Sequence, residues 1–214
     1  MAEFKGLNKV PRGSAGGWTF TEILGKGVIK RKITEVNDAN TEKQQKQRMR
    51  IRGLGKYSQQ VAGLTEITLR EVSRKKGMYH NNLFVSQNKD TIDPTTGIFI
   101  ESELPKLFLS TGSGEAIKSP IALGGGPQEI KVTYSTTGYL PTTSMDTKVL
   151  WAVYNQTQNY LFFGDSGATL STGSIDIGEV GDTNDDVFVY IIAFDVSAKK
   201  GSATQFLGKK TLPA

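Results

Sequence analysis

The stretch VFVYIIAF at residues 187–194 is the most apolar uninterrupted run in the sequence. It is rich in β-branched and aromatic side chains and contains neither Gly nor Pro, a composition that favours a strand over a helix. Turn-forming residues bound it, with TNDD at 183–186 before it and KKG at 199–201 after it. Because the run does not alternate with polar residues, we expect both of its faces to be covered, as in the centre of a β-sandwich. We therefore predict that it is the central strand of a β domain.

The rest of the C-terminal half is also strand-like. Residues 129–134 alternate polar and apolar side chains, and residues 148–154 form a second apolar strand in which Trp151 would anchor a core. About seven short strands with polar or Gly-rich turns in roughly a hundred residues are typical of an immunoglobulin-like β-sandwich. We assign this sandwich to residues 101–214, and we predict a mainly β fold with a helical N-terminal part (α+β). The other predicted strands are residues 105–110, 160–163, 168–177 (one strand or a pair) and 205–207.

Residues 1–40 are predicted to be a basic, Gly-rich arm followed by a hairpin. The first 17 residues are rich in Gly, Ser and Pro, which indicates an extended or loosely tethered segment. Residues 18–24 and 28–34 then have the composition of two strands around the turn Gly25-Lys26-Gly27. This glycine pair lacks the spacing of a phosphate-binding loop, so a hairpin turn is the better interpretation.

Residues 41–100 are predicted to be a basic helical segment. TEKQ at residues 41–44 is a capping box that opens a helix running to about Gln60. Leu54, Tyr57 and Val61 give this helix a modest apolar stripe.

A second helix, or a turn and a helix, is predicted over residues 65–76. Cations near its C-terminal end suit the helix dipole, and Gly77 fits the position just past the last turn.

Charge divides the chain. Residues 1–100 carry 18 Lys and Arg against 9 Asp and Glu, whereas residues 101–214 carry 8 against 12. This asymmetry is evidence about partners. The basic half could bind an acidic protein surface or nucleic acid, or its cations could simply form solvated helix faces. The candidate partner-binding residues are Lys30, Arg31, Lys32, Lys43, Lys46, Arg48, Arg50, Arg52, Lys56, Arg74, Lys75 and Lys76.

The sequence offers no catalytic or cofactor-binding motif. There is no Cys, which excludes disulfides and thiolate chemistry, and His80 is the only His, so we expect it to have a surface or capping role. Asp182, Asp185 and Asp186 form an acidic turn that could hold calcium, but their spacing does not match an EF-hand. Residues 124–126 (GGG) are read as a connection between strands and not as a dinucleotide-binding fingerprint. We therefore predict no metal, no cofactor and no enzymatic activity.

No window approaches the roughly 18 apolar residues that a membrane span needs. The first five residues, MAEFK, also lack the apolar core of a signal peptide. We therefore expect the protein to assemble in the host cytoplasm and not to associate with a membrane.

Several short motifs carry a family resemblance. They are Thr41-x-x-Gln44-x-x-x-Arg48, NLFVS-x-N at residues 82–88, LFLS-x-G at residues 107–112 and FLG at residues 206–208. In order and spacing the chain resembles a family of proteins of about this length from Bacteroidota-type bacteria and their crAss-like tailed phages. The family has no established catalytic residues, and the resemblance implies a structural protein of a phage virion or a surface assembly.

We therefore expect a non-enzymatic virion component, either capsid-associated or part of a neck, tail or fibre. Its basic N-terminal segment would dock on other virion proteins, within a homo-oligomer or symmetric assembly, and its sandwich would be presented outward. One alternative is a nucleic-acid-binding protein that uses residues 43–76. The other is a carbohydrate-binding or adhesion module, for which Tyr139, Tyr154 and Tyr160 could line a surface, although core packing accounts for these three residues equally well.

Overall fold

The structure is a computed structural model of the whole chain. The chain divides into two compact units, residues 1–44 and residues 45–214, which are described separately. The residues whose structure is described are 2–4, 13–23, 26–32, 39–112, 114–125 and 128–213.

The N-terminal unit is a four-stranded antiparallel sheet with the order β1-β4-β3-β2. Strands β3 (Trp18–Ile23) and β4 (Lys26–Arg31) form the predicted hairpin, although residues 24, 25, 33 and 34 lie outside the described residues. Strands β1 (Ala2–Phe4) and β2 (Gly13–Ala15) lie in the segment predicted to be an extended arm, and both pair with the hairpin. The backbone of β1 pairs with β4, and the backbone of β2 pairs with β3. Such pairing needs no apolar side chains, so the apolar pattern of the sequence does not reveal it.

The C-terminal half is a β-sandwich, as predicted. All strand pairs in its two sheets are antiparallel. The chain crosses from the smaller sheet to the larger one between β6 and β7, and it returns between β8 and β9, a Greek-key connectivity typical of immunoglobulin-type sandwiches. The smaller sheet has the order β5-β6-β9, and its strands are β5 (Ile121–Gly124), β6 (Ile130–Thr133) and β9 (Ser174–Ile177). The larger sheet has the order β11-β10-β7-β8, with β12 also paired to β10; its strands are β7 (Lys148–Asn155), β8 (Tyr160–Thr169), β10 (Asp186–Asp195), β11 (Lys200–Gly201) and β12 (Gln205–Thr211).

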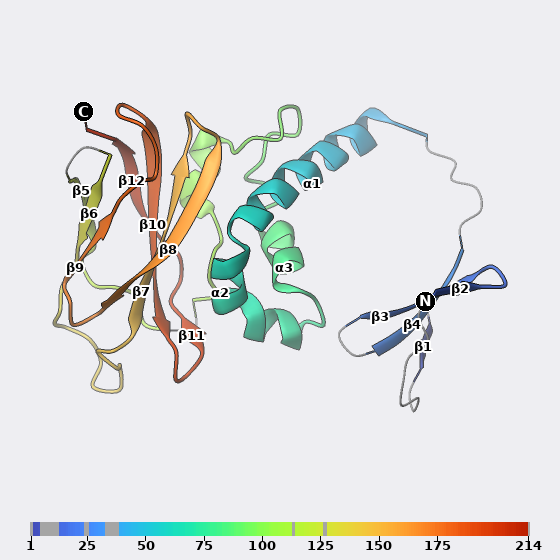
Figure 1. Cartoon of the computed structure of the whole chain (residues 1–214), viewed down its shortest axis with the longest axis horizontal. Helices are drawn as coiled ribbons and strands as arrows, with labels where there is room; N and C mark the ends of the chain where they lie inside the picture. The colour runs from blue at the N-terminus through green and yellow to red at the C-terminus, as the bar shows by residue number, and fades with distance from the viewer. Residues whose placement is uncertain are drawn as a thin grey trace. The chain divides into compact units, whose positions relative to one another are not determined.

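Strand β10 lies at the centre of the larger sheet, and both of its faces are covered (Figure 1). Val189 and Ile191 point into the core between the two sheets. Phe188 and Tyr190 point to the opposite side, into the core under the helices. The prediction of a central strand buried on both faces is therefore confirmed, with the second cover provided by helices and not by a sheet.

Three helices cover that second face: α1 (Glu42–Gln60), α2 (Ala62–Lys75) and α3 (His80–Gln87) (Figure 1). The predicted capping box begins α1, because the Thr41 N–H donates to Gln44 Oε1 at 3.0 Å and the Gln44 N–H donates to Thr41 Oγ1 at 3.4 Å. The predicted stripe of Leu54, Tyr57 and Val61 is fully buried.

The predicted end of α2 is also confirmed. Gly77 has a left-handed backbone with φ of 67°, its N–H donates to the Arg74 carbonyl, and the Met78 N–H donates to the Ser73 carbonyl. This pair of hydrogen bonds is a Schellman motif. The sequence analysis did not predict the short elements α3 and β5.

The predicted strand at residues 105–110 is wrong. Residues Glu101–Lys106 form a 3-10 helix, η1, with Pro105 inside it. Among the described residues, those that directly follow η1 have no strand partner apart from one bridge between Thr111 and Ala203. Pro105 lacks a backbone N–H, which removes one donor that a strand ladder would need.

Side chains take the place of a partner strand in this segment. The Asn88 side chain accepts from the Phe108 N–H at 2.7 Å and donates to the Phe108 carbonyl at 2.9 Å. Thr204 Oγ1 accepts from the N–H groups of Leu109 and Ser110 at 2.9 and 3.1 Å. These bonds satisfy a buried, irregular backbone that holds apolar side chains against the sheet.

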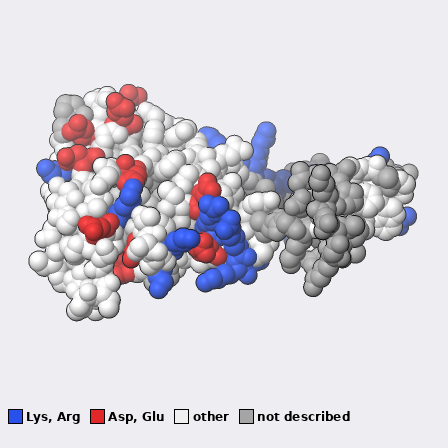
Figure 2. Space-filling view, turned by 60° about the horizontal axis from the view of Figure 1, so that its bottom comes forward, with Lys and Arg blue, Asp and Glu red and all other residues white. Residues whose placement is uncertain are grey.

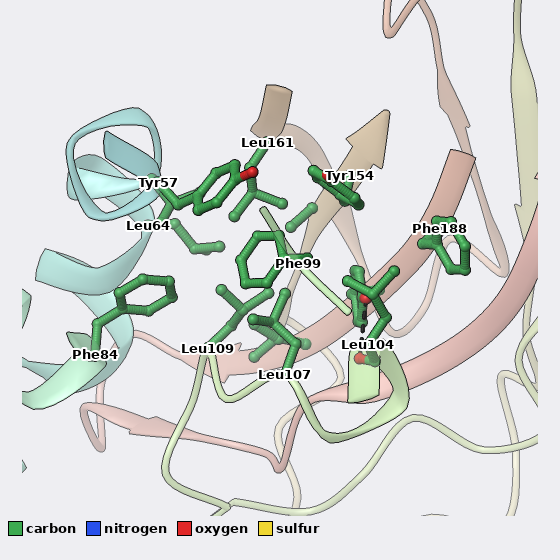
Figure 3. Packing of buried hydrophobic residues seen from close by; sticks show 14 of the residues in the cluster. Tyr57, Leu64, Phe84, Phe99, Leu104, Leu107, Leu109, Tyr154, Leu161 and Phe188 are labelled. Carbon is green, nitrogen blue, oxygen red and sulfur yellow. Dashed lines mark hydrogen bonds between the residues drawn. The ribbon is translucent and has the colours of Figure 1, made fainter. Parts of the chain in front are cut away.

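The helices, this segment and the larger sheet share one core, which Figure 3 shows from close by. The predicted domain boundary between residues 100 and 101 falls inside the unit of residues 45–214.

Candidate partner-binding surface

The cations of α1 lie on different sides of the helix. Arg48, Arg52 and Lys56 recur every four residues and are exposed, on the side opposite the buried Leu54. The Lys56 ammonium also donates to the Asn159 carbonyl at 3.2 Å. Arg50 is half-buried on the packed side, and its Nε is buried without a hydrogen-bond partner among the described residues. Lys46 is exposed one turn further toward the start of α1.

Four candidate cations belong to the N-terminal unit. Lys30 and Arg31 are exposed on β4, Lys32 is exposed just after it, and Lys43 is exposed in the first turn of α1. The two units are not placed relative to each other, so the structure does not bring these four together with the other eight.

The C-terminal end of α2 carries the second group of cations. Arg74, Lys75 and Lys76 are exposed there, and Arg70 lies one turn earlier. Figure 2 shows a dense group of Lys and Arg side chains, with Asp and Glu side chains beside it, on the side where α2 ends in Figure 1.

Beside this end of α2 lies a groove of about 730 Å³, which we call the α2 groove. One wall is α2 itself, from Gly63 to Arg74. The other is the helix-facing side of the larger sheet with the turn after β10, and it contributes Lys148, Leu150, Asp165, Phe194, Val196 and Lys199.

The α2 groove has apolar side chains that reach solvent. Ile67 on α2 is 46% exposed, and Val196 in the turn after β10 is 55% exposed. Phe163 is 38% exposed and packs close to Gly63, where an added Cβ would lie 2.9 Å from the ring. Gly63 thus lets α2 approach β8 closely at this end of the groove.

Two ion pairs use part of the charge in the groove. Lys148 Nζ lies 2.6 Å from Asp165 Oδ2, and Arg70 lies 3.5 Å from Glu66. Burial alone would raise the pKa of Asp165, but hydrogen bonds from Lys148 and from the Gly167 N–H outweigh it and lower the pKa.

Cations predominate among the charges that remain. Of the described residues, no carboxylate lies within ion-pair distance of Arg74, Lys75, Lys76 or Lys199. The sequence analysis identified Arg74, Lys75 and Lys76 but missed the groove, because Lys199 and Val196 join it from a turn more than a hundred residues away.

The acidic turn before β10 is a structural feature. Asp185 is buried, and its carboxylate accepts from Asn155 Nδ2 at 2.7 Å and from the Asp182 N–H at 2.9 Å. The Asn155 hydrogen bond is the main cause that lowers the pKa of Asp185. Asp186 pairs with Lys209 at 3.1 Å. Protein donors therefore bind Asp185 Oδ2 and Asp186 Oδ2, and no group of three or more metal-ligating side chains occurs in the described part of the chain.

The remaining candidates have separate positions. His80 Nδ1 lies 3.1 Å from Thr65 Oγ1, a contact that links α3 to α2. The three tyrosines proposed for a carbohydrate surface do not form one: Tyr154 is fully buried, the Tyr139 hydroxyl is engaged by Lys118 N–H and Ser135 carbonyl, and only Tyr160 is exposed. Within the described ranges, no helix is both long and apolar enough to cross a membrane.

Comparisons with known proteins return matches among solved structures only. No model of a known protein family matches the sequence, and no curated protein matches it significantly. The chain is similar to the FN5 domain of Drosophila Lar, with 10% identity and a TM-score of 0.34 over 46% of this chain and 95% of that one. It is also similar to the fn3 domain of the human collagen alpha-1(XX) chain, with 11% identity and a TM-score of 0.33 over 49% of this chain and 93% of that one. The immunoglobulin-type assignment rests on the strand order and connections described above.

Proposed function

We propose that the protein is a non-enzymatic structural component of a phage virion, associated with the capsid or part of a neck, tail or fibre. In this proposal the helical layer docks on an acidic surface of another virion protein, and the sandwich is presented on the far side. The observation that carries the docking part is the placement of cations: Arg48 and Arg52 on the outer side of α1, and Arg74, Lys75 and Lys76 at the exposed end of α2. The virion part rests on the family resemblance of the sequence.

Fractionation of particles tests this proposal. Virions from a culture that produces the phage carrying this gene are purified on a density gradient, washed with nuclease and high salt to remove adsorbed protein, and measured by quantitative mass spectrometry. We expect the protein at a fixed ratio to the major capsid protein, and immunogold electron microscopy is expected to label one region of the particle. A protein found only in the soluble fraction would refute the proposal.

Nucleic-acid binding is the second candidate. One observation favours it: Tyr79 is 51% exposed and follows Lys76 by three residues, so an aromatic ring is available near cations. On α1, however, the aromatic residue is Tyr57, which is fully buried and cannot stack on a base. Fluorescence anisotropy with labelled DNA distinguishes nucleic-acid binding from docking on a protein. Phosphate contacts make the logarithm of the DNA affinity fall by about 0.9 per contact for each tenfold rise in salt concentration.

A further inference from the structure

The α2 groove exposes apolar side chains that the fold does not need there. Ile67 lies on the outer part of α2 and Val196 lies in a turn, and both positions accept polar residues in a stable fold. Phe163 is also exposed, beside Gly63, although it does not line the groove. Single exposed apolar residues need no explanation, but a group that surrounds a concave surface with charged residues at its rim is typical of an interaction site.

The floor of the groove continues the main core. Leu150 and Phe194 line the groove and also belong to the cluster of buried residues under the helices. An apolar side chain placed in the groove would therefore extend an existing core instead of forming a new one.

Charge selects the kind of occupant. Of the lining charges outside the two ion pairs, Arg74 and Lys199 have no carboxylate partner among the residues the structure describes, and Glu71 is the one carboxylate. Lys75 and Lys76 follow Arg74 at the end of α2 without lining the groove. An occupant with carboxylates beside its apolar side chains would complement this excess of positive charge. Phosphates of a nucleic acid would pair with the same cations but would leave Ile67 and Val196 in contact with water.

We propose that the α2 groove binds an acidic peptide segment of a partner protein. The segment seats one or two apolar side chains between Ile67 and Val196, and its carboxylates pair with Arg74 and Lys199. The inference deepens the proposed docking role, since it names the surface and the chemistry of the partner, and it can be tested without virions.

A display library of random 16-residue peptides, selected against the full chain, provides an unbiased test. We expect the enriched peptides to combine Asp or Glu with large apolar residues. Synthetic fluorescent versions are then titrated by anisotropy. Ile67→Glu and the double variant Arg74→Glu/Lys199→Glu are each expected to weaken binding by about tenfold or more.

Matched controls lie on the opposite layer of the sandwich. Ile121→Glu changes an apolar residue that is 56% exposed, and Lys131→Glu reverses a cation on β6; both are expected to bind as the unchanged protein does. Val196→Glu replaces Ile67→Glu if the latter does not fold, as judged by circular dichroism and thermal melting.

Three results would overturn the inference: no enrichment, enriched peptides without acidic residues, or binding that Ile67→Glu leaves unchanged. A different result would assign the site to nucleic acid instead. In that case no peptide is enriched, a labelled duplex DNA binds the full chain, and the double variant Arg74→Glu/Lys199→Glu no longer binds this DNA. Groove binding without incorporation into virions would refute the virion role and leave this inference standing.

Discussion

The two faces of the larger sheet are packed in different ways. The face toward the smaller sheet is mainly aliphatic, with Val187, Val189 and Ile191 of β10 against residues such as Val132 and Ile177, although the half-buried Trp151 and Phe162 also pack against it. The face toward the helices is aromatic and carries hydroxyl groups. The buried rings of the core on this side, from the sheet and from the segments that cover it, are Tyr57, Phe84, Phe99, Tyr154, Phe188, Tyr190 and Phe194.

The aromatic face needs more specific partners than the aliphatic face, where the Tyr134 hydroxyl donates to the Thr169 carbonyl at 2.8 Å. Tyr57 and Tyr154 both donate hydrogen bonds to Asn159 Oδ1, the second at 3.0 Å, and Tyr190 donates to the Leu104 carbonyl at 3.0 Å. Buried hydroxyls are costly when unpaired, so the hydrogen bonds of Tyr57 with Asn159 and of Tyr190 with Leu104 favour the observed packing of the helices and η1 on the sheet.

Stacking reinforces this position. The Tyr57 and Phe99 rings are 4.1 Å apart, and Tyr154 meets each of them edge-on (Figure 3). Aromatic pairs prefer such arrangements, which fix orientation as well as distance. The aliphatic core thus holds the two sheets together, and the aromatic core fixes where the helices dock.

The largest effect is expected from removing the helical layer. A chain that retains only residues 110–214 exposes the side chains of Phe188, Tyr190, Ile192 and Phe194, which are at most 7% exposed in the complete unit. We expect this fragment to aggregate or to bind a hydrophobic dye strongly, as measured by light scattering and dye fluorescence.

The control for this truncation is a chain that lacks residues 1–40. It keeps the capping box and the unit of residues 45–214, so we expect a monodisperse protein with a nearly unchanged melting temperature. A soluble, cooperatively folded fragment of residues 110–214 would show that the aromatic face does not depend on the helices.

The next largest effect is expected at Asn159. Asn159→Ala removes the acceptor of two tyrosine hydroxyls and places Ala at a φ of 52°. We expect the free energy of unfolding to fall by about 2–4 kcal/mol in urea titrations, from two unpaired hydroxyls and the left-handed backbone.

Two variants separate these causes. Asn184 also has a left-handed backbone, with φ of 69°, and Asn184→Ala is expected to cost only about 1–2 kcal/mol of backbone strain. Asn159→Gly removes the acceptor without the strain. If Asn159→Gly is as stable as the unchanged protein, the hydroxyl pairs contribute nothing to docking.

Local features of the sequence predicted local features of the structure. The capping box at residues 41–44, Gly77 and the run at residues 187–194 each depend on neighbours in the chain, and each was confirmed. The strand at residues 105–110 failed because its backbone partners, the side chains of Asn88 and Thr204, come from distant positions. Alternation alone could not reveal these partners.

The same limit applies to the candidate surface. The cations at residues 74–76 were predicted from a charge run in the sequence. The groove beside them is also formed by the turn after β10, which lies more than a hundred residues later in the chain. Tyr154 was assigned to a possible surface because a Tyr in an apolar strand has the same pattern whether its hydroxyl faces water or a buried partner such as Asn159.

The smallest expected effect appears only in alkaline solution, and it compares the two faces directly. Burial raises the pKa of Tyr57, Tyr154 and Tyr190 on the aromatic face, and it raises the pKa of Tyr134, between the sheets, to about 12. Tyrosines in the unfolded chain titrate near pKa 10. Above about pH 10 the unfolded state loses protons that the folded state keeps, so the stability present below that pH decreases as the pH rises toward about 12.

Tyr→Phe variants assign this loss to one face. Tyr190→Phe removes one such proton from the aromatic face, and Tyr134→Phe removes one from the face between the sheets. We expect urea midpoints to fall less steeply above about pH 10 in Tyr190→Phe than in the unchanged protein, with a weaker change in Tyr134→Phe, whose pKa is raised less. Lysine titration is common to all three proteins and cancels in the comparison. Equal slopes in all three would mean that neither hydroxyl is held in the folded state as the structure places it, and the distinction between an aromatic face with specific partners and an aliphatic one would lose its main support.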